Sequence, residues 1–600
     1  MRIAAVNIPA RLLSPVFRQD RPNITINLGG QNIYTFLEDD QLEVKPNPFF
    51  LEDIFGNQIS LFSCIVGENG RGKSTILRLM TSSHDCSFVI EQSDGRYSVT
   101  NDIDHIHRVY YTPYLHQSVL NAIGNNGKDL SKLALLKTDN HGDTGLLDDF
   151  MEAHHSENSK RWIRFNHFYR QSHSKPISLP VFDHVKLSIR HFDASVHNPD
   201  SFHDTSYQLR PAIMLLFNKM QQEQQDKEHL ALGSRNLGDK ESDKTIFRIR
   251  FEYDIYEAAI AKLVSILERA GNRFLSEGFI PNNWTFELNS RSVREGIEWF
   301  LRNAGVYSDK DRYSFHQHLQ LLDLIDYTLS VADDEGVTEN WREIIISEAE
   351  ALQIIQKFDY FNNSFQGDWF KYDEKPMFGF EPQLAVSSGE QQFLNLFSTL
   401  YFHAQNIGAG IDIDLHSFDS LKYIDKDILL LLDEGDNAFH PQWKKEYVRY
   451  LRNIMPSIFP NLNIQIIITS HDPLTLSDLP KNNVIFLEKG IDGTIIGNST
   501  LKRTFGANVA DLLKDSFFLQ DGQIGNFVAD VIDKMISDME NRTLSEIRIQ
   551  TIERIINTLD EPIMKIKLAE KLSNATGNRV FERKLLDDEI ERLRSRRDHL

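Results

Sequence analysis

Short, nearly continuous apolar runs and helically spaced apolar positions alternate in the first and last thirds of the chain. The runs 61–66, 428–432 and 464–468 are each long enough for one buried strand. A helical period starts soon after the first of them, at Ile76, Leu77 and Met80. An unbroken apolar run is typical of a strand that is covered on both faces, so the pattern indicates an α/β arrangement.

Extended runs also occur near the N-terminus, where turn signals separate them. Residues 24–28 and 33–36 lie on either side of Gly29-Gly30. We expect them to form an antiparallel sheet beside the strand at 61–66. Asp94-Gly95 is a hairpin signal between two further runs, and residues 109–112 are expected to form another strand.

Residues 121–380 contain little Pro or Gly and are expected to form a compact, mainly helical insertion. Its apolar stripes lie at Ile213, Leu216, Phe217 and Met220, at Ile255, Ala258, Ala259, Leu263 and Ile266, and at Leu319, Leu322 and Ile325. The polar stretch 221–244 predicts a solvated helix end or a mobile loop. Four histidines lack regular metal-ligand spacing and are assigned to the surface or to loops: His154, His155, His167 and His173.

Composition narrows the class of protein. The 600 residues suggest two or three domains or subdomains, and 41% hydrophobic content supports packed globular structure. The formal net charge of −21 argues against a protein that coats nucleic acid without sequence preference, although a local basic patch remains open. Only two cysteines occur, and Cys64 is expected to be a small buried core residue. With no membrane-span pattern and no signal-peptide core, the chain is expected to be cytoplasmic.

The segment Gly67–Ser74 has the form GxxxxGK[ST], which is the pattern of a phosphate-binding loop. It follows a predicted strand and precedes a predicted helix, and that context is what makes the pattern specific. Its glycines allow backbone N–H groups to converge on phosphate oxygens, Lys73 can reach the β- and γ-phosphates, and the Ser74 hydroxyl can bind Mg²⁺. The candidate nucleotide-binding residues here are Gly67, Asn69, Gly70, Gly72, Lys73, Ser74 and Thr75.

A second set of candidate residues lies after residue 380. Ser387 and Glu390 form a capping-box pattern at a predicted helix start, where free N–H groups can meet an anion. Asp433 and Glu434 follow a buried strand, so Asp433 can hold Mg²⁺ through water and Glu434 can act as a general base. His471 ends the next run, where it could contact the γ-phosphate or the attacking water. Thr112 and Gln117 are open alternatives for positioning a Mg²⁺-bound water.

Taken together, these motifs resemble the ABC-type ATPase head, and within it the soluble branch of SMC, RecF and OLD-like proteins. The resemblance implies a mixed α/β sheet flanked by helices, with head segments 1–120 and 381–490, the insertion 121–380 and a helical C-terminal region 491–600. It also implies ATP and Mg²⁺ as ligands, Ser74 and Asp433 at the metal, and Glu434 and His471 as catalytic residues. The signature Ser388-Gly389-Glu390, capped by Ser387, would act on the ATP held by a second copy, which implies a head-to-head dimer. A Q-loop glutamine is not clearly present, and His440-Pro441 replaces the usual D-loop aspartate.

A narrower resemblance comes from 432–436, 440–443, 469–473 and the stretch Phe505-Gly506-Ala507-Asn508 onward to Phe527. These segments are similar to the ATPase subunit of bacterial Septu anti-phage systems, and similar subunits accompany some retrons. The resemblance implies a separate HNH endonuclease as partner, with a reverse transcriptase and its retron DNA as further partners in a retron, and nucleic acid bound through the complex. No nuclease is expected in this chain, because Asp412-Ile413-Asp414 lies before the Asp433 strand and not after it, where OLD-like relatives carry theirs.

Two other functions remain open at this point. A RecF- or SMC-like ATPase would clamp DNA itself and would show salt-sensitive, ATP-dependent DNA binding. A pure scaffold would carry a degenerate ATPase site, but the set Lys73, Ser74, Asp433, Glu434 and His471 is complete. The acidic charge and the lack of long heptad patterns count against the DNA clamp.

Overall fold

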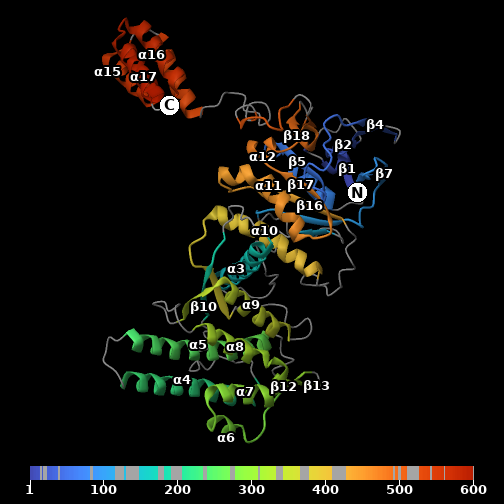
Figure 1. The fold of residues 1–600 in the computed structure, drawn as a ribbon, viewed down its shortest axis with the longest axis vertical. Coiled ribbons are helices and arrows are strands. Elements are labelled where there is room, and N and C mark those ends of the chain that lie inside the picture. Colours follow the sequence, from blue (N-terminus) through green and yellow to red (C-terminus); the bar gives the residue numbers. More distant parts are fainter. Residues whose placement is uncertain are drawn as a thin grey trace. The chain divides into compact units, whose positions relative to one another are not determined.

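The fold is taken from a computed structural model (Figure 1). It describes residues 1–13, 16–17, 23–37, 41–81, 86–114, 127–129, 147–172, 181–190, 206–233, 240–269, 277–308, 311–332, 342–364, 377–408, 427–490, 493–497, 502–509, 512, 526–540, 544–559 and 561–598. The chain divides into two compact units, Met1–Phe517 and Phe518–Leu600. Each unit is described by itself.

One sheet of the first unit has seven strands, in the order β19-β18-β5-β17-β16-β8-β9, and Figure 1 labels β5, β16, β17 and β18 of it. Its neighbouring strands are parallel except for the pair β18 and β19. The strands are β5 Ile59–Gly67, β8 His107–Tyr111, β9 Gly127–Asp129, β16 Asp427–Asp433, β17 Asn463–Thr469, β18 Val484–Lys489 and β19 Thr494–Ile496. The predicted α/β fold with a mixed sheet is therefore confirmed, and all three apolar runs are strands.

Successive residues of β16 point to opposite faces of the sheet, and both faces are covered. Leu430 and Leu432 pack with the helices α10 (Ser388–Gly408), α11 (Pro441–Ile458) and α12 (Pro473–Ser477). Leu429 and Leu431 pack on the other face with α1 (Lys73–Thr81) and strands β1 and β6. This two-sided burial explains why the run Ile428–Leu432 contains no polar residue.

An antiparallel sheet of order β2-β1-β6-β7 adjoins this second face. Its strands are β1 Arg2–Pro9, β2 Asn23–Asn27, β6 Ser87–Glu91 and β7 Tyr97–Thr100, and β3 Asn32–Phe36 pairs separately with β4 Leu42–Pro46. The predicted hairpin is present, since β6 pairs with β7 and Gly95 adopts a positive φ of 82° in the turn. One turn of 3-10 helix, η1 Ala10–Leu13, follows β1.

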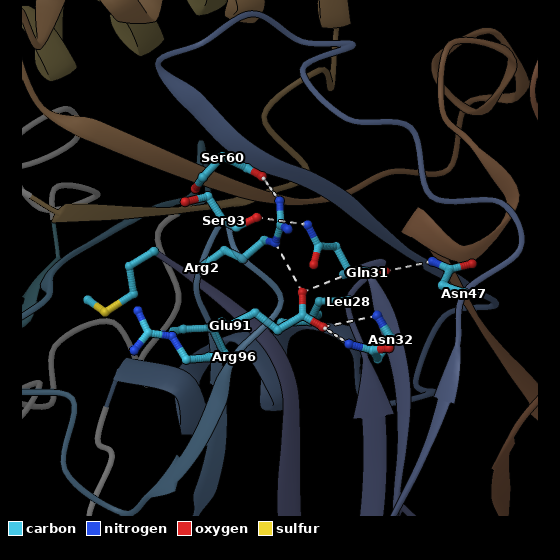
Figure 2. Close-up of polar contacts among 12 residues, drawn as sticks. Arg2, Leu28, Gln31, Asn32, Asn47, Ser60, Glu91, Ser93 and Arg96 are labelled. Atoms are coloured by element: carbon cyan, nitrogen blue, oxygen red, sulfur yellow. Dashed lines mark hydrogen bonds and ion pairs between the residues drawn. The ribbon is translucent and has the colours of Figure 1, made fainter.

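A buried carboxylate holds this antiparallel sheet together (Figure 2). Glu91 has no exposed surface, and its two oxygens accept hydrogen bonds from four residues. Arg2 Nε (3.1 Å) and the Gln31 amide (2.8 Å) donate to one oxygen, while the Asn32 amide (3.0 Å) and the Tyr34 hydroxyl (2.7 Å) donate to the other. The carboxylate therefore joins β6 to β1, to β3 and to Gln31 in the turn before β3.

Replacing Glu91 with glutamine is expected to destabilise the first unit by about 3 kcal/mol, because the Arg2 guanidinium loses its buried counter-charge. The matched control is Glu43→Gln, which breaks the exposed pair with Lys45 and should cost less than about 1 kcal/mol. Urea denaturation of both variants measures the difference. If both variants lost the same free energy of unfolding, the buried ion pair would contribute no more to stability than the exposed one.

The segment predicted as a helical insertion is mainly helical but also contains strands. Its helices are α3 Leu147–Ser172, α4 Arg210–Gly233, α5 Lys240–Arg269, α6 Trp284–Asn289, α7 Val293–Asn303, α8 Gln320–Val331 and α9 Glu348–Asn363, with the 3-10 turn η4 Phe315–His318. Two three-stranded antiparallel sheets, absent from the prediction, consist of β10 His184–Ile189, β14 Glu343–Ser347 and β15 Phe378–Pro382, and of β11 Gly278–Phe279, β12 Gly305–Ser308 and β13 Asp311–Ser314. These strands are two to six residues long, too short for the sequence pattern to separate from loops.

The predicted boundaries at 120, 380 and 490 stay predictions, and α3 illustrates the difficulty of drawing them. Trp162 and Phe165 of α3 pack in the core that α10 and α11 form on the main sheet, and Trp162 Nε1 donates to Asn395 Oδ1 at 2.9 Å. Ile163, next to them, belongs instead to the core of the helical region. One helix therefore contributes to both cores.

The polar stretch 221–244 continues α4 to Gly233 as a largely exposed helix end, which agrees with one of its two predicted forms. His155 and His167 are partly exposed and lie beside Glu381 and Glu348, in keeping with their assignment to the surface. Four residues that the sequence analysis discussed lie outside the described residues: Gln117, His173, Asp412 and Asp414.

The second unit is helical, as predicted for the C-terminal region. Its helices are α14 Asn526–Glu540, α15 Glu546–Thr558, α16 Pro562–Thr576 and α17 Val580–Asp598. Ile532, Met535 and Ile552 are buried in its core, whereas Phe527 of α14 is 80% exposed. Across the described parts of both units, no helix is long and apolar enough to span a membrane.

Candidate functional site

Three parallel strands of the main sheet bring the candidate residues to one edge. β5 ends at Gly67, where the phosphate loop begins, and its neighbour β17 ends at Thr469. The next strand, β16, ends at Asp433, which is paired in register with Thr469. Because the carboxyl ends of parallel strands are where α/β sheets place ligands, this edge is the candidate site.

The phosphate loop has the conformation that its glycines allow. Gly70 and Gly72 adopt φ values of +77° and +91°, a region that residues with a side chain rarely adopt. A Cβ atom at Gly67 would lie 2.8 Å from Leu487, and one at Gly72 would lie 2.9 Å from the Phe17 ring. The three glycines are thus required by backbone conformation or by close packing. Asn69 and Gly70 are exposed at the tip of the loop, and Ser74 and Thr75 are partly exposed at the start of α1.

Lys73 is 5% exposed and folds back over its own loop. Its Nζ donates to the backbone oxygens of Gly67 at 2.9 Å and of Glu68 at 3.4 Å. Burial lowers the pKa of Lys73, and the charges of Glu434 and Asp433 act in the opposite direction. The ammonium group is therefore hydrogen-bonded to its own loop and is close enough to the two acids at the end of β16 for their charges to act on it.

Asp433 is 4% exposed, and neighbouring strands hold both of its oxygens. Thr469 Oγ1 donates to Oδ1 at 2.6 Å, and the Tyr110 hydroxyl donates to Oδ2 at 2.8 Å. Burial and the Asp433 charge raise the pKa of Tyr110, so the phenol remains protonated as a donor. Neither Thr469 nor Tyr110 was among the sequence candidates. The only available signal was their position near the ends of predicted strands.

Glu434 lies next to Asp433 with a left-handed φ of +53°, an unusual conformation for a residue with a side chain. Its amide donates to Thr469 Oγ1 at 2.8 Å, so one hydroxyl contacts both acidic residues. Its Oε1 is 3.1 Å from His471 Nε2. This hydrogen bond lowers the pKa of Glu434, which keeps the carboxylate ionised.

The predicted capping box is present at the start of α10. The Ser387 amide donates to Glu390 Oε2 at 2.8 Å, and the Glu390 amide donates back to Ser387 Oγ at 3.4 Å. Ser387 and Ser388 are exposed. A Cβ atom at Gly389 would lie 3.0 Å from the Ala438 carbonyl oxygen and 3.6 Å from the Trp443 ring. The structure thus places this helix start against the segment that follows Glu434, with its serines facing solvent.

A second buried acid, Asp436, lies next to the site and was not predicted to matter. It is 4% exposed, and it accepts hydrogen bonds from Ser470 Oγ at 2.5 Å and Thr475 Oγ1 at 3.2 Å. Burial raises its pKa. His440 caps α11 by accepting a hydrogen bond from the Gln442 amide, which is a structural role at the start of this helix.

The donors at this edge suit a hard divalent cation. The Ser74 hydroxyl and the Asp433 carboxylate are oxygen ligands of the kind that Mg²⁺ takes. Among the described residues, each Asp433 oxygen accepts one hydrogen bond, which leaves lone pairs for a metal or its waters. Among the described residues there is no cluster of three or more His, Cys, Asp or Glu side chains suited to a metal. Mg²⁺ usually binds one or two protein groups together with phosphate oxygens and water. Thr112 is 4% exposed, and its Oγ1 accepts from the Tyr114 amide.

Two curated proteins share short stretches of similar sequence with this chain. "Septu protein PtuA" of Bacillus mycoides (strain KBAB4) is 31% identical over 112 residues, which are 19% of this chain and 15% of that protein. "Retron Vc95 probable ATPase" of Vibrio cholerae serotype O1 biovar El Tor is 25% identical over 128 residues, which are 21% of this chain and 22% of that protein. The chain therefore aligns with less than a quarter of either relative.

A family match covers a much longer part of the chain. Residues 163–477 match the family described as "AAA domain, putative AbiEii toxin, Type IV TA system". The matched range begins after the phosphate loop and includes the α10 start, Asp433, Glu434 and His471. Since it spans more than half of the 600 residues, the chain belongs to this family of ATPase domains.

Proposed function

We propose that this chain binds and hydrolyses ATP as the regulatory subunit of an anti-phage defence complex. The observation that carries the proposal is the arrangement at one sheet edge of Lys73, Asp433 and Glu434 with His471. A phosphate-binding cation, a metal-binding carboxylate and an ionised base are the groups that phosphoryl transfer to water requires.

Each residue has a distinct task in this proposal. The amides of Gly67–Thr75 and the Lys73 ammonium bind the phosphates, and Ser74 and Asp433 hold Mg²⁺, which neutralises phosphate charge when bound. Glu434 accepts a proton from the attacking water as general base. His471 orients Glu434 and keeps it ionised, since its hydrogen bond lowers the pKa of that carboxyl.

The proposed active unit is a homodimer in which each copy completes the other's site. Ser387, Ser388, Gly389 and Glu390 are proposed to contact the ATP bound by the second copy. The exposure of the two serines supports this, because a helix start that faces solvent can meet an anion carried by another chain. Both closed sites would then exist only when ATP is bound.

The proposed partner is a separate HNH endonuclease whose activity depends on the nucleotide state of the ATPase. In a retron setting, a reverse transcriptase and its DNA would join the complex. The names of the two relatives support a defence role, although the aligned stretches cover only a small part of each relative. Co-expression with the product of a neighbouring HNH gene should yield a stable complex. DNA degradation by the purified chain alone with Mg²⁺ would contradict the separate nuclease.

Thr469→Val is expected to lower ATP turnover by about tenfold or more, because it removes the hydroxyl that orients both Asp433 and Glu434. The Mg²⁺ concentration for half-maximal activity should rise, whereas nucleotide binding without Mg²⁺ should be unchanged. Thr469→Ser keeps the hydroxyl and should restore activity. The matched control is Thr475→Val, equally buried but bonded to Asp436. Equal effects of the two valine variants on the Mg²⁺ dependence would contradict this role.

A further inference from the structure

A preformed groove lies in the first unit outside the nucleotide site. It has a volume of about 620 Å³ and is formed by three segments: the chain after β4, the chain around η6 (Lys481–Asn483) and the stretch Arg503–Asn508. The third segment contains Phe505-Gly506-Ala507-Asn508, a motif that the ATPase chemistry does not use. The groove therefore combines an unexplained motif with a cavity of the size that proteins use for ligands and anchoring side chains.

Apolar side chains line the groove although they face solvent. Phe49 is 37% exposed, Leu51 47% and Phe505 54%, and all three line the cavity together with Pro48 and Pro480. Single exposed apolar residues are ordinary, but a group of them around one concavity marks an interaction site.

Two cationic side chains stand at the same groove. Lys481 and Arg503 both line it, and the Lys481 ammonium lies 5.5 Å from the centre of the Phe49 ring. The chain as a whole has a net charge of −21, whereas the described residues that line the groove include these two cations and no Asp or Glu. A partner with carboxylates beside an apolar anchor would complement it.

Hydrogen bonds fix the walls of the groove in place. Asn47 Oδ1 accepts from the Phe49 amide at 3.0 Å and from Asn482 Nδ2 at 2.5 Å, which joins the first wall to the second. The Gly506 amide donates to the Ser477 oxygen at 2.8 Å, which joins the third wall to the end of α12. A site that is already ordered loses less entropy when it binds.

The groove is also connected to the nucleotide site through one short helix. Asp472, which follows His471, is the N-cap of α12. The helix ends at Ser477, whose backbone oxygen accepts the hydrogen bond from the Gly506 amide. Pro480 and Lys481 follow within ten residues of His471. A partner in the groove would therefore contact the segment that carries a proposed catalytic histidine.

We propose that this groove docks a segment of a partner protein that carries an aromatic or branched aliphatic side chain flanked by carboxylates. This rests on the proposed function in one respect, that the ATPase acts together with another protein. The apolar side chain fills the space beside Phe49 and Phe505, and the carboxylates lie near Lys481 and Arg503. A single-stranded nucleic acid would instead place bases on the rings and phosphates on the cations, and the lining, which is mostly apolar, favours the peptide.

The test is selection of peptides from a random twelve-residue display library on the full chain, with counter-selection on the Phe505→Asp variant. Enriched peptides should carry an aromatic or aliphatic anchor with Asp or Glu within three positions. Synthetic copies should lose at least about tenfold in affinity for Phe505→Asp and none for the control Phe286→Asp, which changes another exposed phenylalanine, on α6. The double variant Lys481→Glu and Arg503→Glu should prefer copies in which the acids are replaced by lysine.

Three results would overturn the proposal: no enrichment over the counter-selected variant, enriched peptides without acids, or tighter binding of a labelled oligothymidine than of any selected peptide. ATP turnover and ATP-dependent dimerisation are measured on the same variants and should stay at wild-type levels. A defect there with normal peptide binding would count against the proposed ATPase cycle and not against the groove.

Discussion

Replacing Glu434 with glutamine is expected to reduce ATP turnover by at least about 100-fold while ATP binding persists. The amide keeps the shape of the side chain but cannot accept the proton of the attacking water. The phosphate loop and Asp433 are unchanged, so the nucleotide remains bound and the closed dimer should accumulate. Single-turnover hydrolysis and light scattering after size-exclusion chromatography, each with ATP and Mg²⁺, measure the two effects.

The control for this variant is Glu570→Gln, which changes an exposed glutamate on α16 to the same amide. It should hydrolyse ATP at the wild-type rate and show no excess of dimer. Normal turnover by the Glu434→Gln variant would exclude Glu434 as the base. Loss of turnover without an ATP-dependent dimer would agree with Glu434 as the general base but would contradict the proposal that two copies share their nucleotide sites.

Mixing two inactive variants is expected to restore activity if the sites are shared between copies. Lys73→Ala removes the phosphate-binding cation, and Ser388→Arg places a bulky charge at the exposed start of α10. Each homodimer then lacks both functional sites. A mixed dimer has one intact site, which combines Lys73 of one copy with Ser388 of the other. Random exchange of equal amounts in a two-fold dimer should therefore recover about a quarter of the wild-type rate.

The matched control replaces Ser388→Arg with Tyr207→Arg, a change at a residue that is 76% exposed in the helical region. This variant should be active alone, and mixing it with Lys73→Ala should give no more than the sum of the separate rates. If the Lys73→Ala and Ser388→Arg mixture stays inactive while mixed dimers are demonstrably present, each copy must hold a complete site of its own.

The fold was predictable in outline because its main signals are local. The apolar runs of β5, β16 and β17 indicate strands covered on both faces, and each is buried as expected. The capping box at Ser387 and Glu390 marks the start of α10 through hydrogen bonds within a few residues. Pro441 marks the start of α11 because its ring fixes φ near the helical value. The short strands of the helical region were missed because two to six residues carry no clear period.

The sequence by itself determined the chemical groups that the site requires. The phosphate loop needs glycines whose φ values only a residue without a side chain adopts readily, so Gly70 and Gly72 are recognisable from their spacing alone. Asp433 and Glu434 are recognisable because acidic residues are rarely placed directly after a buried strand unless they are paired or bind a ligand there. Ser74 is part of the phosphate loop, and His471 follows the next apolar run, 464–468.

Only the tertiary structure decided which residues hold those groups in place. Thr469 and Tyr110 bond to Asp433 because β17 and β8 are the neighbours of β16, a pairing between segments 36 and 323 residues apart. Glu91 and the groove around Phe505 likewise depend on segments that are distant along the chain. Strand order and register are set by packing across the whole sheet, so no local pattern contains them.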